Sequence, residues 1–220
     1  MKKSSILILI IICLVGCKKG SNETTITGEI KGLGTDTLYL YGMDELYDRI
    51  DTIYVENDKF SYTTSVDTIT SAYLLLKNRI EYPVFLDKGN KIKIKGDTIN
   101  LNFLTISGNI YNEEFTDFQK VLEDPADPSE KASEETVDKR ITVEKANTAE
   151  EMAEEFILQH HSSYVSLYLL DKYFVQKETP DFSKIKKLVE VMTGVLQDKP
   201  YIERLNETIT QAEKSEIGKY

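Results

Sequence analysis

Between residues 24 and 108, apolar and polar side chains alternate with a period of two, and turn residues interrupt the alternation every eight to twelve residues. This alternation is typical of short strands with one buried face. Asn57-Asp58 is expected to form a hairpin turn, and Pro83 should restrict its strand to a sheet edge or a bulge. The pattern predicts an antiparallel β-sandwich or open barrel of about eight strands. They are expected at residues 26–30, 38–41, 49–56, 60–64, 71–77, 80–87, 91–95 and 102–107.

The period changes to that of a helix after residue 108. Tyr111, Phe115, Phe118 and Leu122 are spaced by four, three and four residues, which predicts one amphipathic helix that leaves the sandwich. Residues 121–155 then hold twelve acidic and four basic side chains. Because this stretch offers little apolar surface to bury and lacks the ligand spacing of an EF-hand, we expect an acidic linker at residues 123–145 and no calcium site.

Residues 146–220 carry start signals for four further helices. We expect helical hairpins packed on one another or on the sandwich, so the chain is predicted to be α+β. The domains are then a sandwich with its exit helix at 24–122 and a helical spacer at 146–220. The start signals are the capping box Thr148–Glu151, a Ser162 or Ser163 cap, Thr179-Pro180 and Pro200, with Gly218 as a C-terminal cap.

The N-terminus resembles a bacterial lipoprotein signal. Lys2 and Lys3 precede ten consecutive apolar residues, a run too short to span a membrane, which takes about 20. The run ends in Leu-Val-Gly-Cys17, which resembles a lipobox and implies removal of residues 1–16, thioether lipidation of Cys17 and acylation of its new amine. Residues 17–23 would form a lipidated tether. An uncleaved anchor or a buried N-terminal strand is the alternative reading.

Composition and motifs argue against several function classes. The chain carries 37 acidic and 27 basic side chains, and a net charge of −10 disfavours a nucleic-acid partner. Cys13 would leave with the signal and lipid would block Cys17, which excludes dithiol chemistry within the mature chain. His160 and His161 are adjacent, so in a helix they point about 100° apart and should not form a metal pair. No hydrolase, zinc-protease or phosphate-loop motif is present, so neither enzymatic activity nor a cofactor is expected.

Several short motifs follow one another along the chain in a recognisable order. They are Thr25-Ile-Thr-Gly-Glu-Ile30, Leu38-Tyr-Leu-Tyr41, Ile50-Asp-Thr52, Lys59-Phe60, Phe85-Leu86 with Gly89, Leu104-Thr-Ile-Ser-Gly108-Asn109, His161-Ser-Ser163 and Leu167-Tyr-Leu-Leu170. Together they resemble a family of domains of unknown function, numbered 4369, which begins many envelope lipoproteins of Bacteroides-type bacteria. In its longer members, a helical spacer leads into a thioredoxin-like domain with a Cys-x-x-Cys pair. Here the sequence stops at about the position where that domain would start.

The strand region has two recurrent features, its tyrosines and its Asp-Thr motifs, which are candidates for ligand binding and for glycosylation. Seven tyrosines either pack across strands or present an exposed row for a sugar or a partner protein. Asp-Thr followed by an aliphatic residue resembles the O-glycan acceptor motif of the same bacteria, although Asp at a turn before a strand also explains it. The tyrosines are Tyr39, Tyr41, Tyr47, Tyr54, Tyr62, Tyr73 and Tyr82, and the candidate acceptors are Thr37, Thr52, Thr68 and Thr98.

These observations favour a non-enzymatic, lipid-anchored binding or scaffolding module of the cell envelope. Lys18-Lys19 lacks an acidic stretch associated with surface display, so the expected location is the outer membrane, facing the periplasm. Its partner would be a thioredoxin-like protein or another envelope protein. The alternatives are a truncated or split thiol:disulfide interchange lipoprotein without its catalytic domain, and a sugar-binding lipoprotein.

Overall fold

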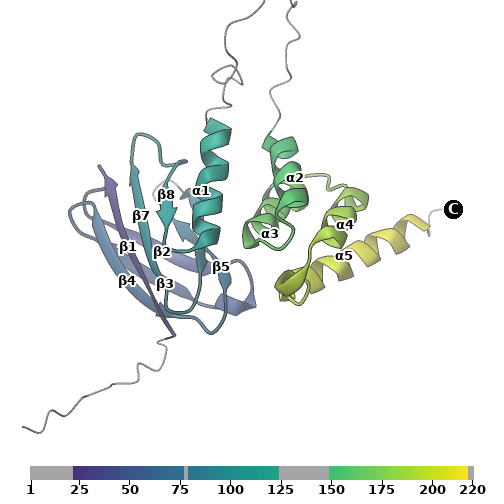
Figure 1. Ribbon diagram of the computed structural model, residues 1–220, viewed down its shortest axis with the longest axis horizontal. Coiled ribbons are helices and arrows are strands. Elements are labelled where there is room, and N and C mark those ends of the chain that lie inside the picture. Colours follow the sequence, from purple (N-terminus) through teal and green to yellow (C-terminus); the bar gives the residue numbers. More distant parts are fainter. Residues whose placement is uncertain (1–21, 77–78, 124–148, 218–220) are drawn as a thin grey trace, which may run out of the picture.

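A computed structural model describes residues 22–76, 79–123 and 149–217 (Figure 1). Eight strands form two four-stranded sheets that pack face to face, followed by helices on one side of them. The strands are β1 (Glu23–Lys31), β2 (Asp36–Gly42), β3 (Ile50–Val55), β4 (Lys59–Ser65), β5 (Thr70–Leu75), β6 (Glu81–Leu86), β7 (Lys91–Asp97) and β8 (Thr105–Ser107), with the short 3-10 helix η1 (Glu45–Tyr47) after β2.

The predicted sandwich is confirmed, and the sheets do not close into a barrel. Sheet A has the order β4-β1-β7-β8 and sheet B the order β3-β2-β5-β6. All pairings are antiparallel except that of β1 with β7, which is parallel and sets Thr25 opposite Lys91. The alternation of apolar residues predicts which face of a strand is buried but not the direction of its neighbour. This parallel pair was therefore outside what the sequence pattern could predict.

Local turn and edge signals in the strand region are confirmed. Asn57 and Asp58 both have positive φ angles, 52° and 69°, as a tight hairpin turn between β3 and β4 requires. Pro83 lies in β6, which is an edge strand of sheet B. Gly28 has a specific packing role, because a Cβ at this position would lie 2.1 Å from the ring of Phe60 on the neighbouring strand.

The exit helix α1 (Ile110–Glu123) follows β8 and lies along the β6 and β8 side of the sandwich. Phe115 and Phe118 are buried, and the Phe115 ring contacts Tyr82 and Phe85 with centroid distances of 5.7 and 6.4 Å. Buried polar groups fix the helix as well: Asn112 Oδ1 accepts a hydrogen bond from the Phe85 amide at 3.0 Å. Phe115 of the predicted amphipathic stripe therefore packs α1 against the sandwich.

The helical region contains the four predicted helices with one altered boundary. Ser163 caps the second of them, and Pro200 opens the last, as predicted. The predicted Thr179-Pro180 start is two residues early, because the side chain of Asp181 accepts the Lys184 amide at 3.0 Å and caps the helix instead. The elements are α2 (Ala149–Gln159), α3 (Tyr164–Leu170) with its π-helical continuation η4 (Asp171–Val175), α4 (Phe182–Val191), the 3-10 turn η5 (Gly194–Leu196) and α5 (Pro200–Ile217).

Several sequence predictions fall outside the described residues. They are the signal at 1–16, the tether up to residue 21 with Cys17, the acidic linker apart from Glu123, the capping residue Thr148 and the C-terminal cap Gly218. In the part of the chain that is described, none of the helices combines the length and the apolar composition needed to cross a bilayer.

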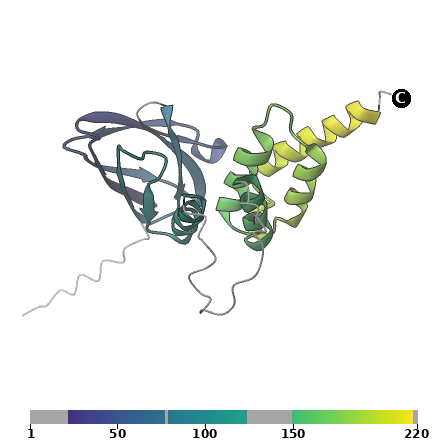
Figure 2. The same cartoon turned by 90° about the horizontal axis from the view of Figure 1, so that it is seen from above.

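The helical region packs directly on α1 and sheet B through aromatic side chains. Figures 1 and 2 both show α3 beside α1, with α4 and α5 farther from the sandwich. Tyr164 of α3 contacts Tyr111 of α1 with ring centroids 5.2 Å apart, and Tyr168 contacts Phe115 at the same distance. Of the two predicted arrangements, packing on the sandwich is therefore present.

Candidate functional site

The outer side of sheet B carries exposed aromatic and aliphatic side chains. In β2, Leu38 and Leu40 point into the sandwich and are fully buried, which directs Tyr39 and Tyr41 outward. In β3, the buried Ile53 directs Tyr54 outward by the same alternation. We call the outward residues Tyr39, Tyr41, Ile50, Tyr54 and Leu75 the aromatic face.

The strand register brings these residues together. Tyr39 pairs with Leu75 of β5 on one side and with Thr52 of β3 on the other, and Tyr41 pairs with Ile50. Tyr54 is a diagonal neighbour of Tyr39, a spacing of about 7–8 Å that aromatic side chains can bridge. Tyr39, Ile50 and Tyr54 are 41, 73 and 72% exposed. Grouped exposed apolar side chains of this kind are typical of a surface that binds a partner or a ligand.

The aromatic face continues into the interface with the helices. The ring of Tyr41 lies 5.6 Å from that of Tyr73, and Tyr73 lies 6.2 Å from Tyr168 of α3. Burial and the hydrogen-bonded carboxylate of Glu81 raise the pKa of Tyr41, so its hydroxyl stays protonated at neutral pH. One half of the outer side of sheet B is thus covered by the helices, and the other half is open.

A buried carboxyl lies where the helices cover the sheet. Asp171 begins η4, is 7% exposed, and accepts hydrogen bonds from the Tyr201 hydroxyl and, at 2.6 Å, from Gln176 Nε2. Burial raises the pKa of Asp171 above its usual range, although these hydrogen bonds and one from Tyr73 oppose the shift. Tyr201 and Gln176 belong to the helical region and Tyr73 belongs to β5, so it is through Tyr73 that Asp171 makes a polar contact with sheet B.

A buried lysine makes a second such contact. Lys199 is 8% exposed, and its Nζ lies 3.4 Å from the Ile69 carbonyl oxygen and 4.9 Å from the centre of the Tyr164 ring. Burial lowers the pKa of Lys199, and the nearby Asp44 carboxylate opposes that shift. The ion pair of Arg204 with Glu45 lies at the same junction of α5 and η1. Nothing local in the sequence distinguishes Asp171 or Lys199 from surface charges.

The tyrosines of the strand region fall into a buried group and an exposed group. Tyr47 and Tyr82 are buried at 4 and 2% exposure and have packing roles. Tyr82 also donates a hydrogen bond to the Leu104 carbonyl oxygen at 2.7 Å, so it fixes β8 against sheet B. Tyr39 and Tyr54 instead present exposed rings on one surface, as the binding reading requires.

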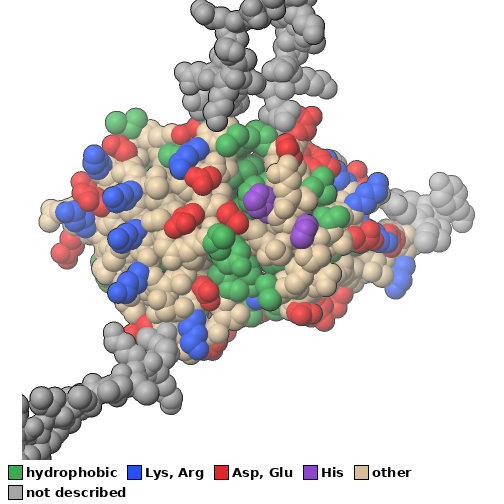
Figure 3. Space-filling model, in the orientation of Figure 1, with side chains coloured by type: hydrophobic (Ala, Val, Ile, Leu, Met, Phe, Trp, Pro, Cys, Tyr) green, Lys and Arg blue, Asp and Glu red, His purple; other side chains and the backbone are tan. Residues whose placement is uncertain are grey.

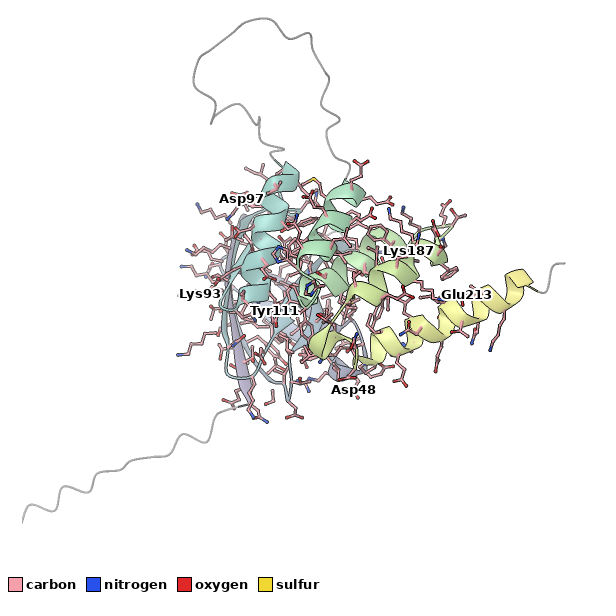
Figure 4. All side chains as sticks on the ribbon, turned by 45° about the vertical axis from the view of Figure 1, so that its right-hand side comes forward. Asp48, Lys93, Asp97, Tyr111, Lys187 and Glu213 are labelled. Carbon is pink, nitrogen blue, oxygen red and sulfur yellow. The ribbon has the colours of Figure 1, made fainter. Side chains whose placement is uncertain are left out.

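The outer side of sheet A differs from that of sheet B because it is polar and basic. Lys91, Lys93 and Lys95 are exposed and alternate with the buried Ile92 and Ile94 along β7. Basic side chains are spread over the sandwich side of the view in Figure 3, and Lys93 points away from the helices in Figure 4. We call the outward lysines of sheet A the lysine face: Lys31, Lys59, Lys91, Lys93 and Lys95.

The two histidines lie just after α2, at the surface seen in Figure 3. His160 stacks on Phe156 with ring centroids 4.2 Å apart, and His161 Nδ1 lies 3.0 Å from the Thr193 hydroxyl. Each ring therefore has a local structural contact at a helix end. Within the described residues, no group of three or more His, Cys, Asp or Glu side chains is arranged to hold a metal ion.

The four candidate glycosylation sites lie in two settings. Thr37 and Thr52 lie in β2 and β3 on the outer side of sheet B, where Thr52 is exposed and Thr37 half-buried. Thr68 and Thr98 lie in turns, the first exposed and the second half-buried. A glycan on Thr37 or Thr52 would lie beside the aromatic face. The lipidation candidate Cys17 lies outside the described residues.

Comparison with known proteins concerns the sandwich and α1. The model of one family, described as a domain of unknown function (DUF4369), matches residues 24–115. No curated protein and no solved structure matches the chain. The matched segment runs from the first residues of β1 to the middle of α1, and so it includes both sheets. Residues 24–115, which hold both sheets and the first part of α1, are therefore similar to the domain of unknown function family DUF4369.

Proposed function

We propose that this protein is a non-enzymatic, lipid-anchored binding module that holds an envelope protein on the aromatic face. The observation that carries the proposal is the exposure of Tyr39, Ile50 and Tyr54 on one side of a rigid sheet. Aromatic side chains are enriched at protein interfaces, because they bury a large area with few rotatable bonds. The lipobox-like Leu-Val-Gly-Cys17 supports an anchor in the outer membrane, with the module facing the periplasm.

The rigid setting of the aromatic face supports this role. Leu38, Leu40 and Ile53 hold its strands from the inside, and Tyr73 continues the face into the helical region. A binding surface on paired strands loses little conformational entropy when it is occupied. The family resemblance places such domains before thioredoxin-like domains in longer lipoproteins, so a thioredoxin-like protein is the first partner to test.

Site-specific photocrosslinking in cells tests the proposal. A photoreactive phenylalanine analogue would replace Tyr39 or Tyr54, and the matched control would carry it at Ser61 on the outer side of sheet A. We expect the same discrete adduct from both tyrosine positions and none from Ser61. Identification of a thioredoxin-like protein in that adduct would also favour a split thiol:disulfide system. Equal adducts from all three positions, or none, would contradict the proposal.

The same rings favour sugar binding as the second candidate. Exposed tyrosine rings can stack on a sugar, and the hydroxyls of Thr37 and Thr52 lie between them to accept or donate hydrogen bonds. Calorimetric titration of the mature chain with envelope oligosaccharides would test this function. We expect heat of binding that Tyr54→Ala and Tyr39→Ala each abolish, with unchanged binding in a Ser61→Ala control.

A further inference from the structure

The lysine face has the opposite charge to the rest of the chain. Its five lysines share the outer side of sheet A with three carboxylates, those of Glu23, Glu29 and Asp97. The whole chain has a net charge of −10. A negative surface would therefore attract this face and repel the remainder of the molecule, which gives the molecule a preferred orientation.

The lysines of this face differ in their neighbours. Lys59 lies 3.9 Å from Glu29. Lys91 and Lys93 lie opposite Thr25 and Thr27 of β1, whereas Lys95 lies opposite Glu29 and Lys31 lies opposite Asp97. On β8, Ser107 lies opposite Lys93 and Thr105 opposite Lys95. Lys91 and Lys93 therefore have uncharged polar residues opposite them across the strands.

The position of the lysine face relative to the proposed anchor suggests what binds to this face. Five residues lie between Cys17 and Glu23 at the start of β1, so the chain from one to the other spans at most about 20 Å. Lys91 pairs across from Thr25, two residues into the same strand. The row from Lys91 to Lys95 extends about 13 Å along β7. A tether of this length lets the whole row reach the surface of the membrane that holds the lipid.

We infer that the lysine face lies against anionic phospholipid headgroups of the membrane in which Cys17 is anchored. This inference rests on the proposed anchor. Sheets A and B pack about 10 Å apart, so the two outer faces point in opposite directions. Contact through sheet A thus directs the aromatic face away from the membrane, where a periplasmic partner has access to it. The headgroup field falls off within about 10 Å, so it acts on the lysine face and not on sheet B.

The first experiment measures lipid binding without the anchor. A soluble chain of residues 18–220 is sedimented with vesicles of phosphatidylcholine, with and without added phosphatidylglycerol, at low salt. Each lysine near the surface contributes about fivefold to partitioning, the equivalent of about 1 kcal/mol. We therefore expect Lys91→Gln, Lys93→Gln and Lys95→Gln together to lower partitioning by roughly a hundredfold. Lys186→Gln, Lys187→Gln and Lys214→Gln, the same charge change on exposed lysines of α4 and α5, should have little effect.

The second experiment measures orientation in the anchored protein. A single cysteine is introduced at Ser61 on sheet A or at Thr52 on sheet B, both exposed, and labelled with a fluorophore in the lipidated chain. Quenchers on lipid headgroups should quench the label at residue 61 more than that at residue 52, and the difference should vanish in high salt. Equal quenching of both labels in anionic vesicles, or no effect of the three Gln substitutions on β7, would overturn the inference. Failure of the lipidated chain to float with vesicles would instead contradict the proposed anchor. The two failures can be told apart, because sedimentation of the soluble chain with vesicles tests the lysine face without the anchor.

Discussion

The division of the tyrosines into packing and binding residues can be tested by one substitution at two positions. Tyr168 is 4% exposed in α3 and contacts Phe115 and Tyr73, whereas Tyr54 is 72% exposed in β3. Tyr168→Ala removes a ring that joins the helices to the sandwich. Tyr54→Ala removes a ring that has no role in the core. The chemical change is identical, so the difference in stability depends on the environment alone.

The structure sets the expected magnitudes. A buried tyrosine removes about 200 Å² from water, and at about 25 cal/mol per Å² this contributes roughly 5 kcal/mol. Tyr168 is nearly fully buried, so we expect Tyr168→Ala to lower the free energy of unfolding by about 3–5 kcal/mol. At about 2–4 °C per kcal/mol, the melting temperature should fall by roughly 10 °C. Tyr54→Ala should change the free energy of unfolding by no more than about 0.5 kcal/mol.

Urea unfolding followed by circular dichroism, together with calorimetry, provides the assay. Tyr168→Phe keeps the ring and serves as the control, because the structure gives the Tyr168 hydroxyl no hydrogen bond among the described residues. If Tyr168→Ala lowers the free energy of unfolding by less than about 1 kcal/mol, packing of this ring does not stabilise the contact between the helices and the sandwich. A loss above about 1.5 kcal/mol in Tyr54→Ala would show that Tyr54 is a packing residue, and the aromatic face would lose its main support.

Three further predictions concern the anchor, the chemistry and the buried acid. Cys17→Ala should slow processing and move the chain from the membrane to the soluble fraction after cell lysis, and wild-type protein that is soluble without detergent would contradict the anchor. The purified mature protein should not accelerate reduction of a model disulfide by an added dithiol, because the sulfur of Cys17 should be a thioether and cannot ionise. Acceleration that persists in a Cys17→Ser control would contradict the non-enzyme proposal. Burial raises the pKa of Asp171, so the stability from its protonated form is present at low pH and is lost as the pH rises through the native pKa. Asp171→Asn should therefore equal or exceed the wild type in stability at pH 7, and this advantage should shrink towards pH 4, near the usual pKa of Asp. Chemical unfolding at both pH values measures the difference in stability. A large loss of stability in the variant at pH 7 would contradict the reasoning.

Local signals predicted most of the secondary structure. The alternation of Ile92 and Ile94 with lysines determined a strand and its buried face. Asn57-Asp58 and Pro83 marked a turn and an edge because their backbone preferences act over one or two residues. The start of α4 was misplaced for a related reason. Two start signals stand next to each other in the sequence, and the side-chain hydrogen bond of Asp181 decides between them.

The tertiary structure alone decided the site. The sequence lists Tyr39, Tyr54, Tyr73 and Tyr82 as similar strand residues, but only the docking of α1 and α3 makes Tyr73 an interface residue and leaves Tyr39 and Tyr54 exposed. The burial of Asp171 has the same origin, because it depends on contacts with segments distant in the sequence.

The parallel pairing of β1 with β7 likewise depends on residues far apart in the chain, and it places lysines of β7 beside threonines of β1. The sequence by itself determined which side of each strand or helix is apolar, because that property follows from the order of neighbouring residues. Which other element covers each outer side follows from long-range packing, and this packing separates the lysine face from the aromatic face.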